Sequence, residues 1–337
     1  MTDPLIIGVS GHSGAGKTTL IESLLPRLGQ RNLRVAVIKR HHQGGVDWDR
    51  PGKDSDRFMV AGAQGVVLGA HGERMGRWSV EEPDWHHGPA TWFPDADLVI
   101  AEGFKEMTWP TLWLGDDAPT STDHLIATLR ARPTVDLDDL TDRIWTQLTA
   151  HVRARPLIGA LLIGGSSRRM GQPKAAIQTS DGQTWAAHVA ACLTPHVSEL
   201  LLIGAGPTGG VDAPIIPDAD PSAGPLSGLL SVTRLRPTAN ILAIPCDLPD
   251  LSADDLSLLT DALAPAIDAI HATTDNEPTL SLPVLLTPSS FPTVATTYQS
   301  GHRAVHRFLS EIRCRPVPVP TTTFSRLRGI NQLPNTD

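Results

Sequence analysis

The feature that most constrains the fold is an apolar run followed at once by a glycine-rich turn, and it occurs twice. The first run covers residues 5–9 and precedes the turn at 11–18. The second covers residues 157–163 and precedes the turn at 164–171. Such an order is typical of the first strand of a parallel α/β sheet. The repetition therefore predicts two α/β sheets with a domain boundary between them.

The length of 337 residues agrees with two domains, at about 100–200 residues each. We expect an N-terminal domain over residues 1–152 and a C-terminal domain over 156–337. The basic connector at 153–156 contains no Gly/Ser run, which predicts a brief linker. Seven of the eight tryptophans precede residue 150, so the two halves also differ in composition.

Alternating apolar runs and helical patterns predict that each domain is a doubly wound, three-layer α/β/α unit. Its binding site should lie at the carboxyl ends of the strands. Further strands are expected at residues 34–39, 65–68, 97–100, 200–203, 241–244 and 279–286. Helices are expected at residues 18–28, 185–192 and 228–235, and a helix is expected to end over 144–151.

Residues 11–18 (GHSGAGKT) match the phosphate-binding pattern GxxxxGK[ST] in full, between a strand and a helix. Glycines let backbone N–H groups turn toward phosphate oxygens. Lys17 should reach the β- and γ-phosphates, and Thr18 should hold Mg²⁺. The pattern thus predicts a P-loop that binds a purine nucleotide through Gly11, Ser13, Gly14, Ala15, Gly16, Lys17, Thr18 and Thr19.

Two downstream segments follow strands of the same sheet. Glu102 comes just after the strand at 97–100, where P-loop enzymes place a second Mg²⁺ or water-positioning group. Asp97 begins that strand, so it should lie at the opposite edge from the site. Residues 39–42 (KRHH) also follow a strand. They fit either the site or a solvated basic turn, and the sequence leaves both interpretations open.

The first half resembles the GTP-binding adapter proteins of molybdopterin guanine dinucleotide biosynthesis, over about residues 5–150. The motifs that carry the resemblance are GHSGAGKT at 11–18, VIK at 37–39, PGKDS at 51–55, AGA at 61–63 and AEGFK at 101–105. The resemblance implies a P-loop NTPase-like domain that binds GTP, hydrolyses it weakly at most, and assists a guanylyltransferase. It also implies a homodimer through this domain. The run at 41–45 (HHQGG) departs from the longer His/Asp-bearing run of the family.

The second glycine-rich turn carries fixed positive charge. Gly164, Gly165 and Ser166 let the backbone approach a triphosphate, and Arg169 and Lys174 follow. Two such cations can stabilise the charge that develops on an α-phosphate and on departing pyrophosphate. This turn is therefore the predicted place of bond-making chemistry.

Two aspartates lie further along the second half. Asp247 follows the strand at 241–244 and stands between Pro245 and Pro249, which fix the backbone, so it suits a Mg²⁺ ligand. Asp218 precedes a second glycine-rich loop at 224–228, which could pack on a base or ribose. Catalysis is thus expected from Arg169, Lys174 and Asp247, and metal binding from Asp247, Thr18 and Glu102.

The second half resembles the molybdenum cofactor guanylyltransferases, over about residues 157–337. The resemblance rests on LxGGxSxRMGxxK at 162–174, PD at 217–218, GPLSG at 224–228 and PCDLP at 245–249. It implies a Rossmann-like nucleotidyltransferase domain that converts Mo-molybdopterin and GTP, with Mg²⁺, into the guanine dinucleotide cofactor and pyrophosphate. The implied GTP contacts are Leu162, Ile163, Gly164, Gly165, Ser166, Lys174, Asp218 and Asp247. Molybdenum-insertion proteins and molybdoenzyme chaperones are the implied partners.

Three departures keep other functions open. Pro173 stands where guanylyltransferases usually have Asp, and Gln-Pro-Lys is common in the cytidylyltransferases. Ile203 stands near a position where the family can offer an Asn, and residues 329–334 match the family's NxNTP loop only in part. Cytidylyl transfer, a sugar-phosphate or isoprenoid nucleotidyltransferase, and a GTP-dependent scaffold with weak transfer are the alternatives.

Composition argues against several other classes. The net charge of -8 disfavours a general nucleic-acid binder. The sequence contains no apolar run of about 18 residues that would span a membrane, and its start lacks the basic region of a signal peptide. The three cysteines are scattered and form no disulfide framework. A cytoplasmic protein is therefore expected.

Overall fold

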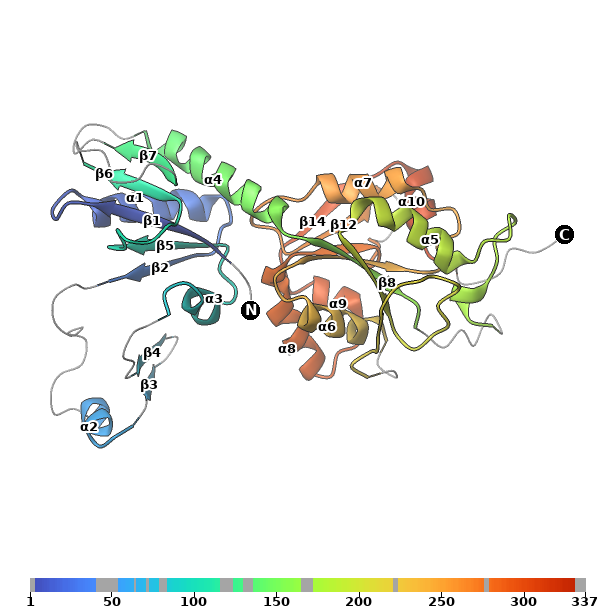
Figure 1. The fold of residues 1–337 in the computed structure, drawn as a ribbon, viewed down its shortest axis with the longest axis horizontal. Coiled ribbons are helices and arrows are strands. Elements are labelled where there is room, and N and C mark those ends of the chain that lie inside the picture. Colours follow the sequence, from blue (N-terminus) through green and yellow to red (C-terminus); the bar gives the residue numbers. More distant parts are fainter. Residues whose placement is uncertain are drawn as a thin grey trace.

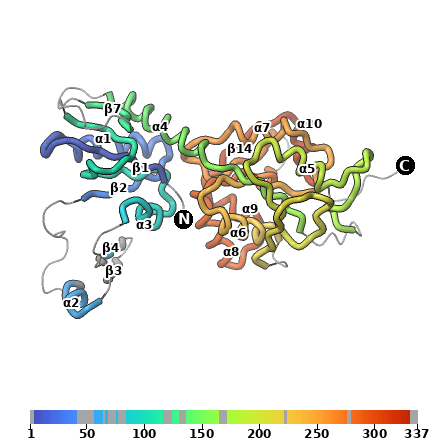
Figure 2. Tube along the Cα trace, in the orientation of Figure 1, coloured from blue at the N-terminus to red at the C-terminus, as the bar shows by residue number. Residues whose placement is uncertain are grey.

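The structure is a computed structural model. It describes residues 4–40, 54–63, 65–70, 73–78, 84–115, 124–129, 136–164, 172–220, 224–275 and 279–330. Two main sheets lie side by side along the long axis of the molecule, one in each half of the chain (Figure 1). The colours of Figure 2 pass from blue to green in one half and from green to red in the other, so each half is built from a continuous segment.

The first sheet has five parallel strands in the order β2-β5-β1-β6-β7. Its central strands β1 and β5 are mostly apolar, as expected for strands that are covered on both faces. Helices α1 and α4 cover one face with buried leucines and isoleucines, and α3 with an aromatic cluster around Phe104 covers the other. The elements are β1 (Leu5–Gly11), α1 (Lys17–Gln30), β2 (Val35–Lys39), α3 (Gly88–Trp92), β5 (Leu98–Glu102), β6 (Thr111–Leu114), β7 (Leu125–Leu129) and α4 (Leu137–Ala154).

The second sheet has seven strands in the order β10-β9-β8-β11-β13-β12-β14, and β13 runs antiparallel to both neighbours. Its strands are β8 (Leu157–Leu162), β9 (Glu199–Ile203), β10 (Ile215–Ile216), β11 (Asn240–Pro245), β12 (Ala269–Thr273), β13 (Val284–Leu286) and β14 (Cys314–Pro318). The strands β8, β11 and β13 are buried at every position except one end residue each of β8 and β11. This is the burial expected for a sheet covered on both faces.

Helices cover both faces of the second sheet. Its two apolar cores contain α5, α7 and α10 on one side and α6, α8 and α9 on the other. The α-helices are α5 (Trp185–Leu193), α6 (Pro225–Leu235), α7 (Ala253–Asp261), α8 (Phe291–Gln299), α9 (Val305–Leu309) and α10 (Thr321–Leu327), and the short 3-10 turns are η1 (Lys174–Ala176), η2 (Thr194–His196) and η3 (Pro288–Ser290). The predicted α/β class with doubly wound sheets is confirmed.

One predicted strand does not belong to the main sheet. The run at 65–68 was expected there, but β3 (Gly65–Ala70) pairs antiparallel with β4 (Glu73–Trp78) in a separate two-stranded sheet beside α2 (Asp54–Val60). Only two residues separate β3 from β4, whereas a parallel pair needs a crossover of about a dozen residues. The expectation was therefore wrong about the partner of this strand.

A second correction concerns the expected strand at 279–286, of which only Val284–Leu286 is a strand. Pro283 immediately precedes it and has no N–H to donate to a neighbouring strand, which is why the ladder starts after it. In the described part of the chain, no helix combines the length and apolar character that crossing a membrane would require.

Candidate nucleotide sites

The P-loop connects the carboxyl end of β1 to the first turn of α1, as predicted. Gly14 and Gly16 have φ values of 75° and 90°, a left-handed conformation that favours glycine. A side chain on Gly11 would bring its Cβ to 2.1 Å from the carbonyl oxygen of Leu114 on the neighbouring strand. The three glycines of the motif are therefore needed for the turn itself and for its close approach to β6.

Lys17 lies over this loop. Its Nζ donates to the carbonyl oxygens of His12, at 2.7 Å, and Gly11, at 3.3 Å. The residue before α1 is Gly16, which offers no side chain to cap the first N–H groups of the helix. Uncapped N–H groups and the positive helix end together favour an anion. The loop thus presents an ammonium group and backbone donors to the same space.

Glu102 and Thr18 meet beside the P-loop. The Oγ1 of Thr18 donates to the carboxylate of Glu102, 3.1 Å from either oxygen, and the Glu102 residue is only 7% exposed. The structure thus brings together the two residues predicted to hold Mg²⁺ in the first half. Asp97 precedes β5 at its other end, as expected.

Lys39 joins the same cluster, which answers part of the question that the sequence left open. Its Nζ lies 3.2 Å from Oε1 of Glu102 and 3.4 Å from Oγ1 of Thr18. Lys39 and Glu102 are partners in the register of β2 and β5. Residues 41–53 lie outside the described residues.

In the second half, Lys174 and Asp247 form an ion pair. The Nζ of Lys174 lies 2.5 Å from Oδ2 of Asp247, and both side chains are mostly buried. Lys174 begins the short turn η1, and Asp247 follows β11 at its carboxyl end. The structure thus brings together two of the three predicted catalytic residues. Arg169, Gly165 and Ser166 lie outside the described residues.

Asp218 lies among glycines at the carboxyl ends of β8 and β9. A Cβ built on Gly164 would lie 3.1 Å from Oδ2 of Asp218, and one on Gly228 would lie 2.9 Å from Oδ1. The N–H groups of Ile163 and Gly164 donate to the carbonyl of Ile203. Burial, with Asp220 nearby, raises the pKa of the Asp218 carboxyl. The predicted residues Leu162, Ile163, Gly164 and Asp218 therefore lie together.

Sequence reasoning did not assign Gly329 to this site, although it noted the partial match of the tail. A Cβ on Gly329 would come within 2.9 Å of both carboxylate oxygens of Asp247. The N–H of Ile330 donates to the carbonyl of Asp247 at 3.0 Å. The side chain of Ile330 packs beside Ile177 and Trp185. The segment after α10 thus lies directly against Asp247.

We expect Gly329→Ala to lower the rate of nucleotidyl transfer by about tenfold to a hundredfold, because the added methyl group displaces the Asp247 carboxylate. Displacements of about 1 Å near reacting groups can cost that much. Gly29→Ala is the matched control, since a Cβ at Gly29 meets no atom within 4 Å. Initial rates and the thermal unfolding temperature are measured for both variants. A wild-type rate in Gly329→Ala would show that the contact does not position Asp247.

Comparison with known proteins gives a separate match for each half. Residues 6–128 match the family model for molybdopterin guanine dinucleotide synthesis protein B, and residues 159–315 match the model for the MobA-like NTP transferase domain. A "probable molybdenum cofactor guanylyltransferase" of Rhodopirellula baltica is 31% identical over 200 residues, which are 55% of this chain and 93% of the relative. The chain belongs to the molybdenum cofactor guanylyltransferase family.

The first half of this family member has relatives of its own. A molybdopterin-guanine dinucleotide biosynthesis adapter protein of Haemophilus influenzae is 40% identical over 115 residues. The match covers 32% of this chain and 62% of the relative, so the chain spans less than two thirds of that adapter protein. The two family matches confirm both resemblances found in the sequence.

Among solved structures, this chain is similar to molybdopterin-guanine dinucleotide biosynthesis protein A from Archaeoglobus fulgidus. The match covers 52% of this chain and 93% of the other, at 17% identity and a TM-score of 0.44.

Proposed function

We propose that this protein transfers GMP from GTP to Mo-molybdopterin, forming the guanine dinucleotide cofactor and pyrophosphate. The observation that carries the proposal is the Lys174–Asp247 pair at the carboxyl edge of the second sheet, in a chain of the guanylyltransferase family. The transferase part covers residues 156–337 in this proposal. Residues 1–152 form a GTP-binding adapter whose P-loop supports the reaction.

The reaction requires charge neutralisation more than it requires a nucleophile of the protein. A terminal phosphate oxygen of molybdopterin attacks the α-phosphorus of GTP, and the bond from that phosphorus to the bridging oxygen breaks as pyrophosphate leaves. Lys174 and Arg169 would neutralise the charge on the phosphates, so that catalysis is mainly positioning and electrostatic. The nearby Cys246 is unsuited to covalent catalysis, because burial raises the pKa of its thiol to about 12.

Mg²⁺ fits both sites by the chemistry of the residues present. In nucleotide sites this ion is bound by one or two protein oxygens together with phosphates and water. Asp247 would supply such an oxygen in the transferase site, and Thr18 and Glu102 would do so beside the P-loop. Among the described residues no three His, Cys, Asp or Glu side chains gather as a metal site. Held by these residues, Mg²⁺ would supply positive charge that offsets the charge of the phosphates.

The proposal includes a homodimer formed through the adapter half. The hairpin β3–β4 and helix α2 extend away from the first sheet (Figure 1). They expose the apolar side chains of Phe58, Val60, Val67 and Met75. An isolated two-stranded hairpin is marginally stable in water, so burial against a second copy would stabilise it.

Molybdenum-insertion proteins and molybdoenzyme chaperones are proposed as further partners. The cytoplasm is the proposed location, where free thiols such as those of this chain persist.

We expect GTP to be the preferred substrate over CTP. Cytidylyl transfer is the second candidate, and Pro173, which immediately precedes η1, is the observation that favours it. The preference is measured in parallel reactions that contain Mg²⁺, Mo-molybdopterin and either labelled GTP or labelled CTP. The rate of pyrophosphate release is compared between the two nucleotides. Faster transfer from CTP would identify the second candidate. GTP binding without pyrophosphate release from either nucleotide would leave a GTP-dependent scaffold as the function.

A further inference from the structure

Four charged residues lie where the two halves of the chain meet. Arg34 and Asp97 immediately precede β2 and β5 of the first sheet, and Asp268 and Arg313 immediately precede β12 and β14 of the second. Each pair of strands is parallel and starts in register. The halves are therefore joined at the edges where the parallel strands begin.

Ion pairs cross this junction, and one of them, between Arg313 and Asp97, has a two-point contact. The guanidinium of Arg313 contacts both oxygens of Asp97, at 2.7 and 2.8 Å, and both oxygens of Asp268, at 3.1 and 2.8 Å. Arg34 contacts Asp268 from the opposite half at 2.7 Å. The side chain of Asp268 is 2% exposed and that of Asp97 is 9% exposed. Such buried pairs are costly to break, because separation leaves a buried charge without its partner.

Helix α4 fixes the same junction from one side. Its residues Leu140, Ile144 and Leu148 belong to the core of the first half, whereas Val152 belongs to a core of the second. The Nδ2 of Asn240, at the start of β11, donates to the carbonyl of Val152 in a buried hydrogen bond of 3.0 Å. Only Arg155 and Pro156 separate α4 from β8. The connection therefore contains no flexible linker.

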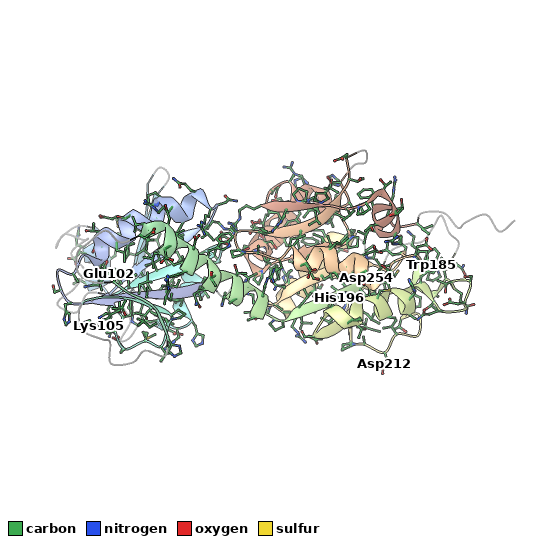
Figure 3. The ribbon with its side chains drawn as sticks, turned by 90° about the horizontal axis from the view of Figure 1, so that it is seen from above. Glu102, Lys105, Trp185, His196, Asp212 and Asp254 are labelled. Carbon is green, nitrogen blue, oxygen red and sulfur yellow. The ribbon has the colours of Figure 1, made fainter. Side chains whose placement is uncertain are left out.

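The junction sets the two nucleotide sites at opposite ends of the molecule. β1 starts in register with β5, which Asp97 precedes at the junction, and ends at the P-loop. β8 starts two residues after α4 and ends at the transferase site. Glu102, beside the P-loop, and Trp185, beside the transferase site, lie in opposite halves in Figure 3. At about 3.3 Å per residue, the two strands alone correspond to roughly 40 Å, which is too far for one nucleotide to contact both sites.

We propose that the P-loop half of one chain supports the transferase site of a second copy of the chain and not its own. This inference rests on the proposed function, in which the P-loop supports transfer. Because the junction is held by buried ion pairs and a shared helix, the P-loop cannot fold back onto the transferase site of its own chain. The transferase site of a second copy is not held away from this P-loop by a junction. A second copy is also present whenever the chain is made.

Complementation between two full-length variants tests this proposal. Lys17→Ala removes the P-loop ammonium and leaves the transferase site intact, while Asp247→Asn does the reverse. The two chains are co-expressed, and they are also mixed after purification, with Asp247→Asn in increasing excess over Lys17→Ala. We expect the transfer rate per intact transferase site to rise from the Lys17→Ala level to that of the wild type. Thr18→Ala replaces Lys17→Ala in a second series.

The control is the chain that carries both substitutions, which should give no rise at any ratio. A rate that stays at the Lys17→Ala level in every mixture would overturn the inference, because the P-loop would then act only within its own chain. A wild-type rate from Lys17→Ala by itself would overturn the proposed role of the P-loop, and this inference with it. The two failures are distinguishable, since the second is visible before any mixing.

Discussion

Asp247→Asn lowers the rate of GMP transfer by about a hundredfold to a thousandfold and leaves GTP binding at the P-loop unchanged. This expectation follows from the position of the carboxylate at the carboxyl edge of the second sheet, 2.5 Å from the ammonium of Lys174. Loss of one preorganised charged group in a phosphoryl-transfer site typically costs that much. The amide keeps the shape of the side chain, so that the change is mainly one of charge.

Initial rates of pyrophosphate release measure the effect, and photo-crosslinking with an azido-GTP followed by peptide mapping reports occupancy of the P-loop. Asp212→Asn is the control, since it makes the same chemical change at an exposed position of the same half (Figure 3). Equal loss of transfer and of P-loop labelling in Asp247→Asn would contradict the model of two separate sites.

Lys17→Ala is expected to weaken GTP binding at the P-loop by about tenfold to a hundredfold and to reduce transfer only in part. In the structure, the ammonium of Lys17 donates to loop carbonyls. When GTP binds, this ammonium would pair with phosphate oxygens instead. A hydrogen bond between charged groups contributes about 1.5–3 kcal/mol, which corresponds to that loss. Arg143→Ala, at an exposed position of α4, is the control. Complete loss of transfer in Lys17→Ala would mean that the P-loop itself takes part in the chemistry.

The parts of the sites that lie close in sequence, or that follow a strand directly, could be predicted. The P-loop is a local motif whose strand and helix are visible in the hydrophobic pattern. Glu102 and Asp247 each follow a buried strand, and the rule that parallel sheets bind ligands at their carboxyl edges places them correctly. The structure agrees, with Glu102 beside Thr18 and Asp247 beside Lys174.

Other contacts depend on the order of strands, which the sequence does not determine. Lys39 reaches Glu102 because β5 lies between β2 and β1, although β5 comes later in the chain than both. Gly329 reaches Asp247 because α10 packs into the core beside α7, where Arg326 pairs with the buried Asp255. Neither contact leaves a local pattern in the sequence. The run of β3 was assigned to the wrong sheet for the same reason, since its apolar pattern does not determine which strand it pairs with.

The shared helix α4 also restricts how this protein can vary. Val152 fills a core that is otherwise built from residues of the second half, and Asn240 binds its carbonyl. Across the junction, Arg313 matches two carboxylates that come from different halves. Loss of one partner would leave a buried charge or carbonyl in the other half without its contact. Although the two halves match separate families, we therefore expect substitutions on the two sides of this junction to affect stability non-additively, as they do across an obligate interface.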